Sequence, residues 1–370
     1  MKHARNTRQY EPVQTTSAYS RSNYGSGSNA SIAVKKRRVW PKVFGVILTV
    51  LVVVLGVAIG AALWYSHQLD AALAPDKETR TKLDNVLEPA SFDNPFYVLI
   101  LGSDSREGHY SSQAAEQGDN QRSDVIILAR IDAKNKLVTL VSIPRDTPWQ
   151  LEDGTLVKIN EMYNREGAVG SIKAVSELTG VPISHYAEVG FTGVQEIVDL
   201  LGGVDVYVNT ELTYWNPITE RYVIVPAGQQ TLDGEHAQIF ARARHEYQEY
   251  EGTQDSNRQS NVRQLLSAVL KKTLDRPVPE IPGVILQEAE YVTTDMKSAD
   301  LVSLAAQFGF DSKNMTLYSG TGPTKGDFVE QADGLYLCYR NPEGWARLMD
   351  VVNAGGEPTG IDFESTQIPW

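Results

Sequence analysis

One stretch near the N-terminus constrains this chain more than any other. Residues 43–66, VFGVILTVLVVVLGVAIGAALWYS, contain no charged side chain. Because a helix of about twenty apolar residues crosses ~30 Å of hydrocarbon, this stretch predicts a single transmembrane helix. A cleaved signal peptide is the alternative, but its apolar core usually has only about 7–15 residues. The 42 residues that precede the stretch also favour an uncleaved anchor.

Charge is distributed unevenly about this segment. Nine Lys and Arg residues and one acidic residue precede Val43, which leaves 25 basic and 45 acidic residues after it. The positive-inside rule therefore places the N-terminus in the cytoplasm and the acidic part outside the plasma membrane. A body this acidic lacks the basic face that displaces counterions from phosphates, so we expect no nucleic-acid partner.

The rest of the chain divides by composition. Residues 1–42 are rich in Ser, Asn and Gly and predict a disordered basic cytoplasmic tail. Residues 67–91 mix charges with Ala, Leu and Pro and predict a stalk or linker outside the membrane. We expect one large folded domain over 92–355 and a C-terminal tail over 356–370. The single cysteine, Cys338, lies in an apolar run, so we expect a buried core residue with no disulfide partner.

Apolar runs and helical periodicity alternate along residues 92–355. Residues 96–101 form a continuous apolar run, which is typical of a strand buried on both faces, and 125–131 with 137–143 predict a hairpin. Strands that alternate with helices indicate an α/β sandwich with a mixed sheet. The further expected strands are 186–189 and 204–208, and the expected helices are 171–178, 192–201, 233–243, 256–274, 298–308 and 342–352.

The common catalytic signatures are absent from the sequence. It has no G-x-S-x-G elbow, P-loop or H-E-x-x-H motif, and its six histidines lack metal-ligand spacing. Arg and Asp residues instead recur at the ends of expected strands and helices. Guanidinium groups match phosphate oxygens and carboxylates hold Mg²⁺, so the set predicts phosphoryl chemistry, with surface ion pairs as the alternative. The set is Asp104, Arg106, Arg122, Asp124, Arg145, Asp146, Arg242, Arg244, Asp255, Arg258 and Arg263.

Three motifs in order carry a resemblance to a known family. They are LILGSDSR at 99–106, RSD at 122–124 and SIPRDT at 142–147. With them the chain resembles the LytR-CpsA-Psr family of cell-wall glycopolymer transferases. The similarity covers about residues 92–355 and continues through 158–160, 198–206, 232–237, 242–244, 263–264 and 293–295.

The resemblance implies a fold and an activity. It implies an α/β/α sandwich with a central mixed β-sheet that transfers a glycan phosphate from a polyprenyl-pyrophosphate carrier to a peptidoglycan sugar hydroxyl, with Mg²⁺ or Mn²⁺. Asp104 and Asp124 would correspond to the acids at the metal. The pyrophosphate-binding residues would be Arg106, Arg122, Arg145, Arg242, Arg244, Arg258, Arg263 and Gln264, and the catalytic residues Arg122, Arg145, Asp146, Arg242, Arg244 and Asp255.

Two other activities stay open at this point. A hydrolase that releases the glycan phosphate to water would need the same Arg and metal apparatus. A membrane-bound sensor could bind the lipid-linked glycan without turnover. A DNA-binding regulator is disfavoured by the acidic external body and by the absence of a DNA-binding motif. The lipid tail of the polyprenyl donor needs an apolar site. The apolar strands and helices could enclose a tunnel for it, but sequence does not distinguish the lining of a tunnel from a filled core.

Overall fold

The computed structural model describes residues 53–54, 64–103, 123–216, 220–244, 254–277, 280–288, 291–309 and 311–370. The fold below is that of Ala58–Trp370, the larger of the two units into which the chain divides. The tail predicted over 1–42 and most of the membrane segment predicted over 43–66 lie outside the described residues. None of the helices within the described ranges is long and apolar enough to cross a membrane.

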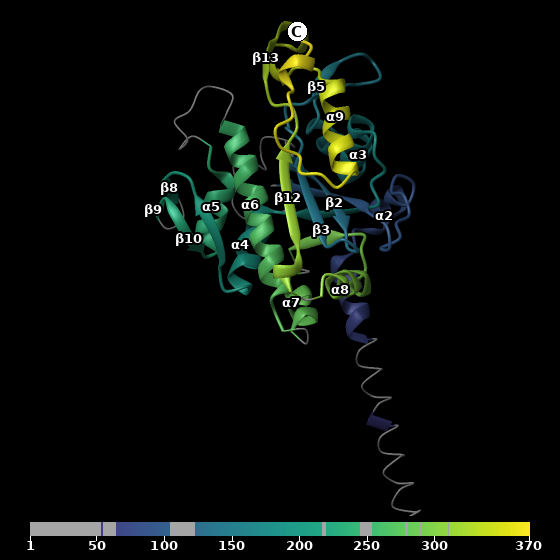
Figure 1. Cartoon of the computed structure of the whole chain (residues 1–370), viewed down its shortest axis with the longest axis vertical. Helices are drawn as coiled ribbons and strands as arrows, with labels where there is room; N and C mark the ends of the chain where they lie inside the picture. Colours follow the sequence, from purple (N-terminus) through teal and green to yellow (C-terminus); the bar gives the residue numbers. More distant parts are fainter. Residues whose placement is uncertain are drawn as a thin grey trace, which may run out of the picture. The chain divides into compact units, whose positions relative to one another are not determined.

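A six-stranded mixed sheet forms the centre of this unit (Figure 1). The β1–β2, β2–β3 and β6–β11 pairs are antiparallel, whereas β1–β6 and β3–β12 are parallel. The hairpin predicted from residues 125–131 and 137–143 is confirmed as β2–β3. In spatial order the strands are β11 (Val292–Thr294), β6 (His185–Val189), β1 (Phe96–Ser103), β2 (Ser123–Asp132), β3 (Leu137–Ser142) and β12 (Thr316–Thr321).

Strand β1 is apolar throughout because both faces of the sheet are covered. Leu99 and Leu101 pack into one buried cluster, and Val98 and Ile100 belong to a second. Successive side chains of a strand point to opposite faces, so these two clusters lie on the two sides of the sheet. A strand buried on both sides reads as a continuous apolar run, which explains the pattern in the sequence.

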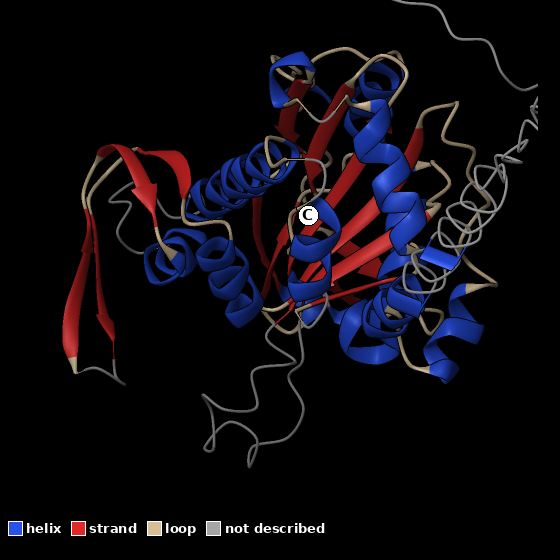
Figure 2. Ribbon diagram, turned by 90° about the horizontal axis from the view of Figure 1, so that it is seen from below, coloured by secondary structure: helices blue, strands red, loops and turns tan. Residues whose placement is uncertain are grey.

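Helices supply both covering layers (Figure 2). Ile172 of α3 and Leu348 of α9 pack with Leu99, while Leu274 of α6 and Leu304 of α8 pack on the opposite side. This arrangement confirms the predicted α/β sandwich. Helix α3 is kinked at Gly167, whose φ of +63° is in the region that glycine tolerates best. The covering helices are α2 (Lys77–Leu83), α3 (Glu161–Thr179) and α9 (Pro342–Asn353) on one face, and α6 (Gln254–Leu274) and α8 (Ser298–Gln307) on the other.

A third buried cluster joins a smaller element of helices and short strands to α6. Val206 of β7, Phe240 of α5 and Leu265 of α6 are members of this cluster. Helix α6 therefore packs against both the main sheet and the smaller element and holds the two together. The elements here are α4 (Phe191–Leu200), β7 (Val204–Val208), β8 (Leu212–Asn216), β9 (Arg221–Val225), β10 (Gly228–Leu232), α5 (Gly234–Arg242) and α7 (Ile281–Glu288).

Residues 356–370, expected as a tail, lie against the β13–β14 hairpin. The Ile368 amide donates to the Arg340 carbonyl oxygen at 2.8 Å, and Trp370 Nε1 donates to the Leu337 carbonyl oxygen at 3.4 Å. These contacts fix the segment on β14. The remaining elements are β4 (Pro148–Gln150), β5 (Leu156–Lys158), β13 (Gly326–Val329), β14 (Leu335–Cys338), η2 (Ser312–Asn314), η3 (Glu330–Ala332) and η4 (Glu364–Thr366).

Cys338 is buried, as predicted, and its reactivity should report on folding. Burial is the main cause that raises the pKa of its thiol to about 12, and nearby Asp146 adds to the shift. Because the thiolate is the nucleophile, Cys338 should resist iodoacetamide at pH 8 in the folded protein and react readily in denaturant, where the pKa returns to about 8.5. Labelling followed by mass spectrometry checks this, and rapid labelling of the folded protein would contradict it.

Candidate active site

The pairing of β2 with β3 brings two predicted site residues together. Ile127 of β2 lies opposite Ser142 of β3 in this antiparallel pair. Asp124, three residues before Ile127, and Arg145, three residues after Ser142, therefore emerge at the same end of the sheet. Arg145 Nη1 donates to Asp124 Oδ1 at 2.8 Å.

Helix α6 adds an acid and a buried cation to this pair. Asp255 and Arg258 are three residues apart in the first turns of α6, a spacing that puts them on the same face. Arg258 Nη2 lies 2.8 Å from Asp255 Oδ1 and donates to the Asp124 carbonyl oxygen at 2.7 Å. The side chain of Arg258 is only 2% exposed, so it ties α6 to the start of β2 from inside the protein.

Arg244, just after α5, completes the group. Its Nη2 lies 3.5 Å from Asp124 Oδ2, and its Nε lies 3.8 Å from Asp255 Oδ1. We call Asp124, Arg145, Arg244, Asp255 and Arg258 the arginine cluster. The side chains of Arg145 and Arg244 are 25% and 24% exposed, so a ligand can reach them, unlike Arg258.

The three guanidinium groups outnumber the two carboxylates of the cluster. Burial alone would raise the pKa of Asp124, but Arg258, Arg145 and Arg244 outweigh it and hold the pKa below its ordinary value. Burial opposes ionisation of Arg145 too, yet its acidic neighbours raise its pKa above the ordinary value. Three guanidinium groups beside two carboxylates give the cluster a positive character that suits an anion carrying several phosphate oxygens.

Some buried polar atoms of the cluster lack hydrogen bonds. Among the described residues, Arg145 Nε and Arg258 Nε have no hydrogen-bond partner. Buried polar groups are nearly always satisfied, and exceptions gather at functional sites. The cluster therefore has donor capacity in reserve, and Arg145 is the accessible one of the two.

Asp146 lies beside the cluster and pairs with a residue that sequence reasoning did not assign to the site. Lys158 Nζ is 2.6 Å from Asp146 Oδ1, and Arg145 Nε is 3.8 Å from Asp146 Oδ2. Lys158 belongs to the 158–160 stretch, which carried part of the family resemblance. That resemblance was the signal in the sequence that could have identified Lys158 as a site residue.

The other predicted residues take different positions. Arg263 Nη1 donates to Ser142 Oγ and Thr321 Oγ1, both at 2.7 Å, and burial lowers its pKa to about 10, so it stays charged at neutral pH. The Gln264 side chain turns to β7, where its Nε2 donates to the Tyr207 carbonyl oxygen at 3.1 Å. Arg242 is exposed in the last turn of α5. Asp104, Arg106 and Arg122 lie outside the described residues.

An apolar cavity begins beside the cluster. It has a volume of about 230 Å³ and lies between the sheet and α6, with Gly102, Val125, Val262 and Leu266 in its lining. Val125 follows Asp124 directly, and Val262 is one helical turn beyond Arg258. At Gly102 a Cβ would come within 2.8 Å of the Val125 Cβ, so a larger residue there would crowd the cavity wall. A charged site and an apolar cavity thus adjoin, a combination that suits an amphipathic ligand.

The donor set of the site is compatible with a hard cation. Within the described residues, no three His, Cys, Asp or Glu side chains gather into a metal-binding group. Mg²⁺, however, is commonly held by one or two carboxylates, with water and substrate phosphates as the other ligands. Asp124 fits that role chemically because its carboxylate oxygens are hard donors at an accessible site.

Comparison with known proteins identifies the family of the chain. Residues 63–338 match the model of the LytR_cpsA_psr family. The chain is 28% identical over 294 residues, 78% of this chain and 89% of the relative, to the polyisoprenyl-teichoic acid–peptidoglycan teichoic acid transferase TagU of Enterococcus faecalis. It is 31% identical to TagU of Bacillus mycoides, over 74% of this chain and 83% of that relative. The crystal structure of Bacillus subtilis TagV superposes with a TM-score of 0.58 at 25% identity, over 71% of this chain and 97% of that one. The chain belongs to the LytR-CpsA-Psr family.

Proposed function

We propose that this protein transfers a glycan phosphate from a polyprenyl-pyrophosphate carrier to a hydroxyl group of a peptidoglycan sugar. The observation that carries the proposal is that the arginine cluster and the apolar cavity are built from neighbouring residues of β2 and α6. The donor has the same two parts, an anionic pyrophosphate and an apolar tail. Membership of the family and the teichoic acid transferase activity of the TagU relatives support the same reaction.

The exposed arginines would hold the pyrophosphate. Arg145 and Arg244 present donors to the phosphate oxygens, while buried Arg258 keeps Asp124 and Asp255 in place beneath them. The acceptor hydroxyl oxygen forms a bond to the phosphorus that carries the glycan, and the bond from that phosphorus to the bridging oxygen breaks. The leaving polyprenyl phosphate gains negative charge, which Arg145 and Arg244 stabilise.

A carboxylate of the site would take the proton of the acceptor hydroxyl. Asp255 is our candidate for this base, because its side chain is 21% exposed and its Oδ1 lies 3.8 Å from both accessible arginines, Arg145 and Arg244. Asp146, held by Lys158, would position Arg145 rather than accept the proton. The Asp255→Asn substitution keeps the shape of the side chain but removes the base. The rate of transfer should therefore fall while the Kd for the donor stays the same, and a binding titration measures that Kd.

We propose Mg²⁺ or Mn²⁺ as the cofactor, with Asp124 and Asp104 as its protein ligands. When bound, such a cation would neutralise charge on the pyrophosphate oxygens. Removal of divalent ions by a chelator should abolish transfer and added Mg²⁺ should restore it. Full activity after exhaustive chelation would contradict this assignment.

We also propose that residues 43–66 anchor the protein in the plasma membrane, with the N-terminus in the cytoplasm and the catalytic domain outside. The uncharged run and the basic residues before it support this orientation. Single cysteines placed in residues 1–42 and 67–91 test it in intact cells. An impermeant thiol reagent should label only the second position, and the opposite pattern would contradict the orientation.

Filling the apolar cavity should weaken binding of long-chain donors. Val269 of α6 lines the cavity, so Val269→Trp should raise the KM for a donor with a long isoprenoid chain about tenfold, the effect of excluding roughly two CH₂ groups. A donor with two isoprene units should be affected less. Lys271→Trp, at an exposed position of the same helix, is the matched control. Equal KM values for the long donor in both variants would contradict a lipid site here.

Acceptor dependence tests the proposed function. The full-length protein in detergent is given a synthetic polyprenyl-pyrophosphate oligosaccharide and Mg²⁺, with or without peptidoglycan fragments, and release of polyprenyl phosphate is followed. The proposal predicts release that depends on the fragments. Equal release without them would indicate a hydrolase, and tight donor binding with no release would indicate a sensor.

A further inference from the structure

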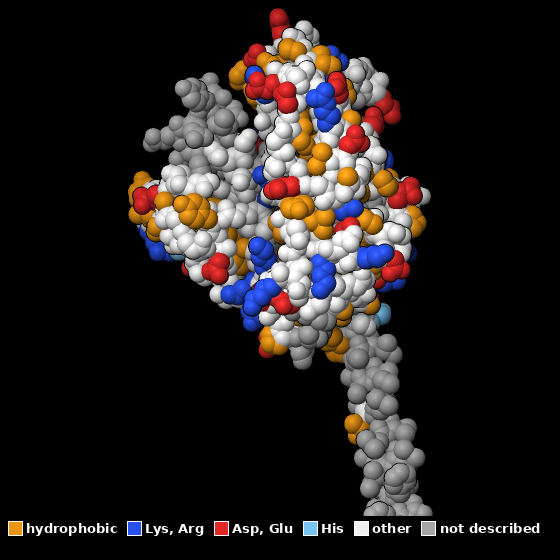
Figure 3. Space-filling model, viewed as in Figure 1, with side chains coloured by type: hydrophobic (Ala, Val, Ile, Leu, Met, Phe, Trp, Pro, Cys, Tyr) orange, Lys and Arg blue, Asp and Glu red, His pale blue; other side chains and the backbone are white. Residues whose placement is uncertain are grey.

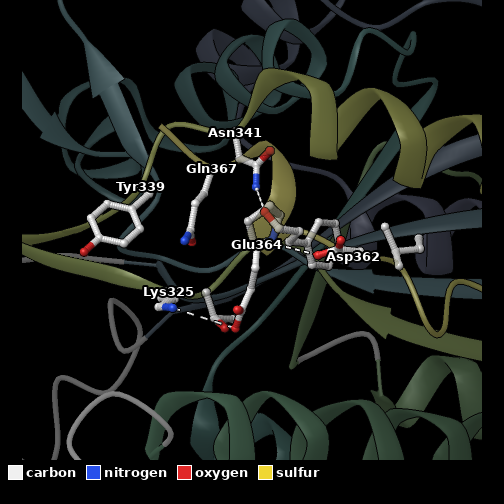
Figure 4. Close-up of a pocket in the computed structure, with 10 residues that line it drawn as sticks. Lys325, Tyr339, Asn341, Asp362, Glu364 and Gln367 are labelled. Carbon is white, nitrogen blue, oxygen red and sulfur yellow. Dashed lines mark hydrogen bonds and ion pairs between the residues drawn. The ribbon is translucent and has the colours of Figure 1, made fainter. Parts of the chain in front are cut away.

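A second cavity lies at the C-terminal end of the fold, separate from the apolar one. Its volume is about 280 Å³. Figure 4 shows the side chain of Gln367 directed into the space between Tyr339 and the ion pair of Lys325 with Glu364. The space-filling view shows acidic and basic side chains close together at this end of the molecule (Figure 3). The labelled lining residues are Lys325, Tyr339, Asn341, Asp362, Glu364 and Gln367.

Two segments form the walls of this cavity, one around Asn341 and one from Ile361 to Gln367, and a hydrogen bond joins them. Asn341 Nδ2 donates to the Phe363 carbonyl oxygen at 2.8 Å, and Asn341 Oδ1 accepts from the Gly344 amide at 2.9 Å. The bridge between Ile368 and Arg340 holds the same segment a few residues further on. Hydrogen bonds within the fold therefore fix the walls of the cavity. The wall from Ile361 to Gln367 lies beyond residue 338, where the match to the family model ends.

The lining offers a varied set of hydrogen-bonding groups around a small space. Gln367 can donate and accept, Lys325 donates, and the carboxylates of Asp362 and Glu364 accept. Tyr339 adds an aromatic ring with a polar end, and Ile361 contributes an apolar surface. A ligand with hydroxyl and amide groups on a compact ring matches this lining and volume. A purely apolar ligand or a highly charged phosphate does not.

The backbone of β14 connects the cavity to Asp146, the residue that follows Arg145 of the arginine cluster. The Cys338 amide donates to the Asp146 carbonyl oxygen at 2.9 Å, and Tyr339 follows Cys338 directly. Hydrogen-bonded strands lie about 5 Å apart and consecutive Cα atoms 3.8 Å apart, so the Tyr339 backbone is within about one sugar ring's length of the residue after Arg145. A glycan strand bound in the cavity would thus extend close to the site of transfer.

From this arrangement we infer that the cavity binds a sugar ring of the acceptor glycan strand, next to the ring that receives the phosphate. The inference rests on the proposed transferase function. It names a subsite for the acceptor that is separate from the pyrophosphate and lipid sites and is formed in part by residues beyond the family match.

Direct binding of a defined saccharide tests the inference. The full-length protein in detergent is titrated with the disaccharide of N-acetylglucosamine and N-acetylmuramic acid by calorimetry. Tyr339→Ala and Gln367→Ala should each raise its Kd at least about fivefold, the effect of one lost hydrogen bond. Glu357→Gln, exposed in the same C-terminal segment but outside the lining, should bind as the wild type does. In the transfer assay, the effect of both cavity variants should fall on the KM for peptidoglycan fragments and not on the KM for the lipid-linked donor.

The possible outcomes separate the inference from the proposed function. Equal Kd values in all four proteins, with intact transfer, would overturn the acceptor subsite alone. Disaccharide binding that depends on Tyr339 and Gln367, in a protein without transfer activity, would support a sugar site and count against the transferase. Maltose, which lacks acetamido groups, should bind more weakly than the disaccharide, and equal binding would overturn the assigned ligand class.

Discussion

Arg145→Ala should lower the turnover number for glycan transfer by about 10²–10³-fold. Arg145 is the accessible arginine that contacts Asp124 at 2.8 Å and lies within 3.8 Å of Asp146 and Asp255. Its removal would take a preorganised positive charge away from the leaving phosphate, where charge develops during the reaction. The rate of polyprenyl phosphate release in the presence of peptidoglycan fragments measures the effect.

Two matched variants sharpen this prediction. Arg145→Lys keeps the charge but loses the planar fork, so it should recover part of the lost rate. Arg165→Ala removes an arginine that is 47% exposed on α3 and pairs only with Glu161 among the ion pairs of the described residues, so its rate should match the wild type. A turnover number in Arg145→Ala within a few-fold of the wild type would contradict the role given to the cluster.

Arg258→Met should destabilise the folded protein by about 3–5 kcal/mol. Arg258 is buried between two carboxylates, 2.8 Å from Asp255 and 3.6 Å from Asp124. Its loss would leave these two negative charges with less positive charge beside them. Burial lowers the pKa of Arg258, although Asp255 and Asp124 oppose that shift. Methionine has a similar length but no charge. The midpoint of thermal unfolding should fall by on the order of 10 °C.

Arg347→Met is the control for this comparison. Arg347 pairs with Glu343 at the surface of α9, and its side chain is 48% exposed. Exposed pairs of this kind contribute little, so the midpoint should change by less than about 2 °C. A similar, small change in Arg258→Met would show that the buried arginine is not needed to hold α6 against β2.

Of the main sheet, the sequence predicted β1, β2, β3 and β6 but neither β11 nor β12. The apolar run at 96–101 predicted a buried strand, and β1 is covered by helices on both faces. Local pattern and tertiary structure agree in this part of the chain. The contact between Asp124 and Arg145, at the end of the predicted hairpin, was found only in the structure.

Other features depended on tertiary contacts that no local pattern specifies. Arg258 and Gln264 are six positions apart on α6, yet one turns into the cluster and the other to β7. The cavity lining uses the same aliphatic residues as a filled core, so composition did not reveal it. The C-terminal segment was expected as a tail, whereas the Ile368 amide and the Trp370 indole donate to the carbonyl oxygens of Arg340 and Leu337, far from them in sequence.

The fate of oxygen during the reaction tests the central claim most directly. The full-length protein, donor and peptidoglycan fragments are incubated in H₂¹⁸O, and the glycan products are analysed by mass spectrometry and ³¹P NMR. Transfer to a sugar predicts a phosphodiester between the glycan and the peptidoglycan fragment, without ¹⁸O, which is lost in Arg145→Ala. A free glycan monophosphate that carries one ¹⁸O atom would show that water is the acceptor and would contradict the transferase.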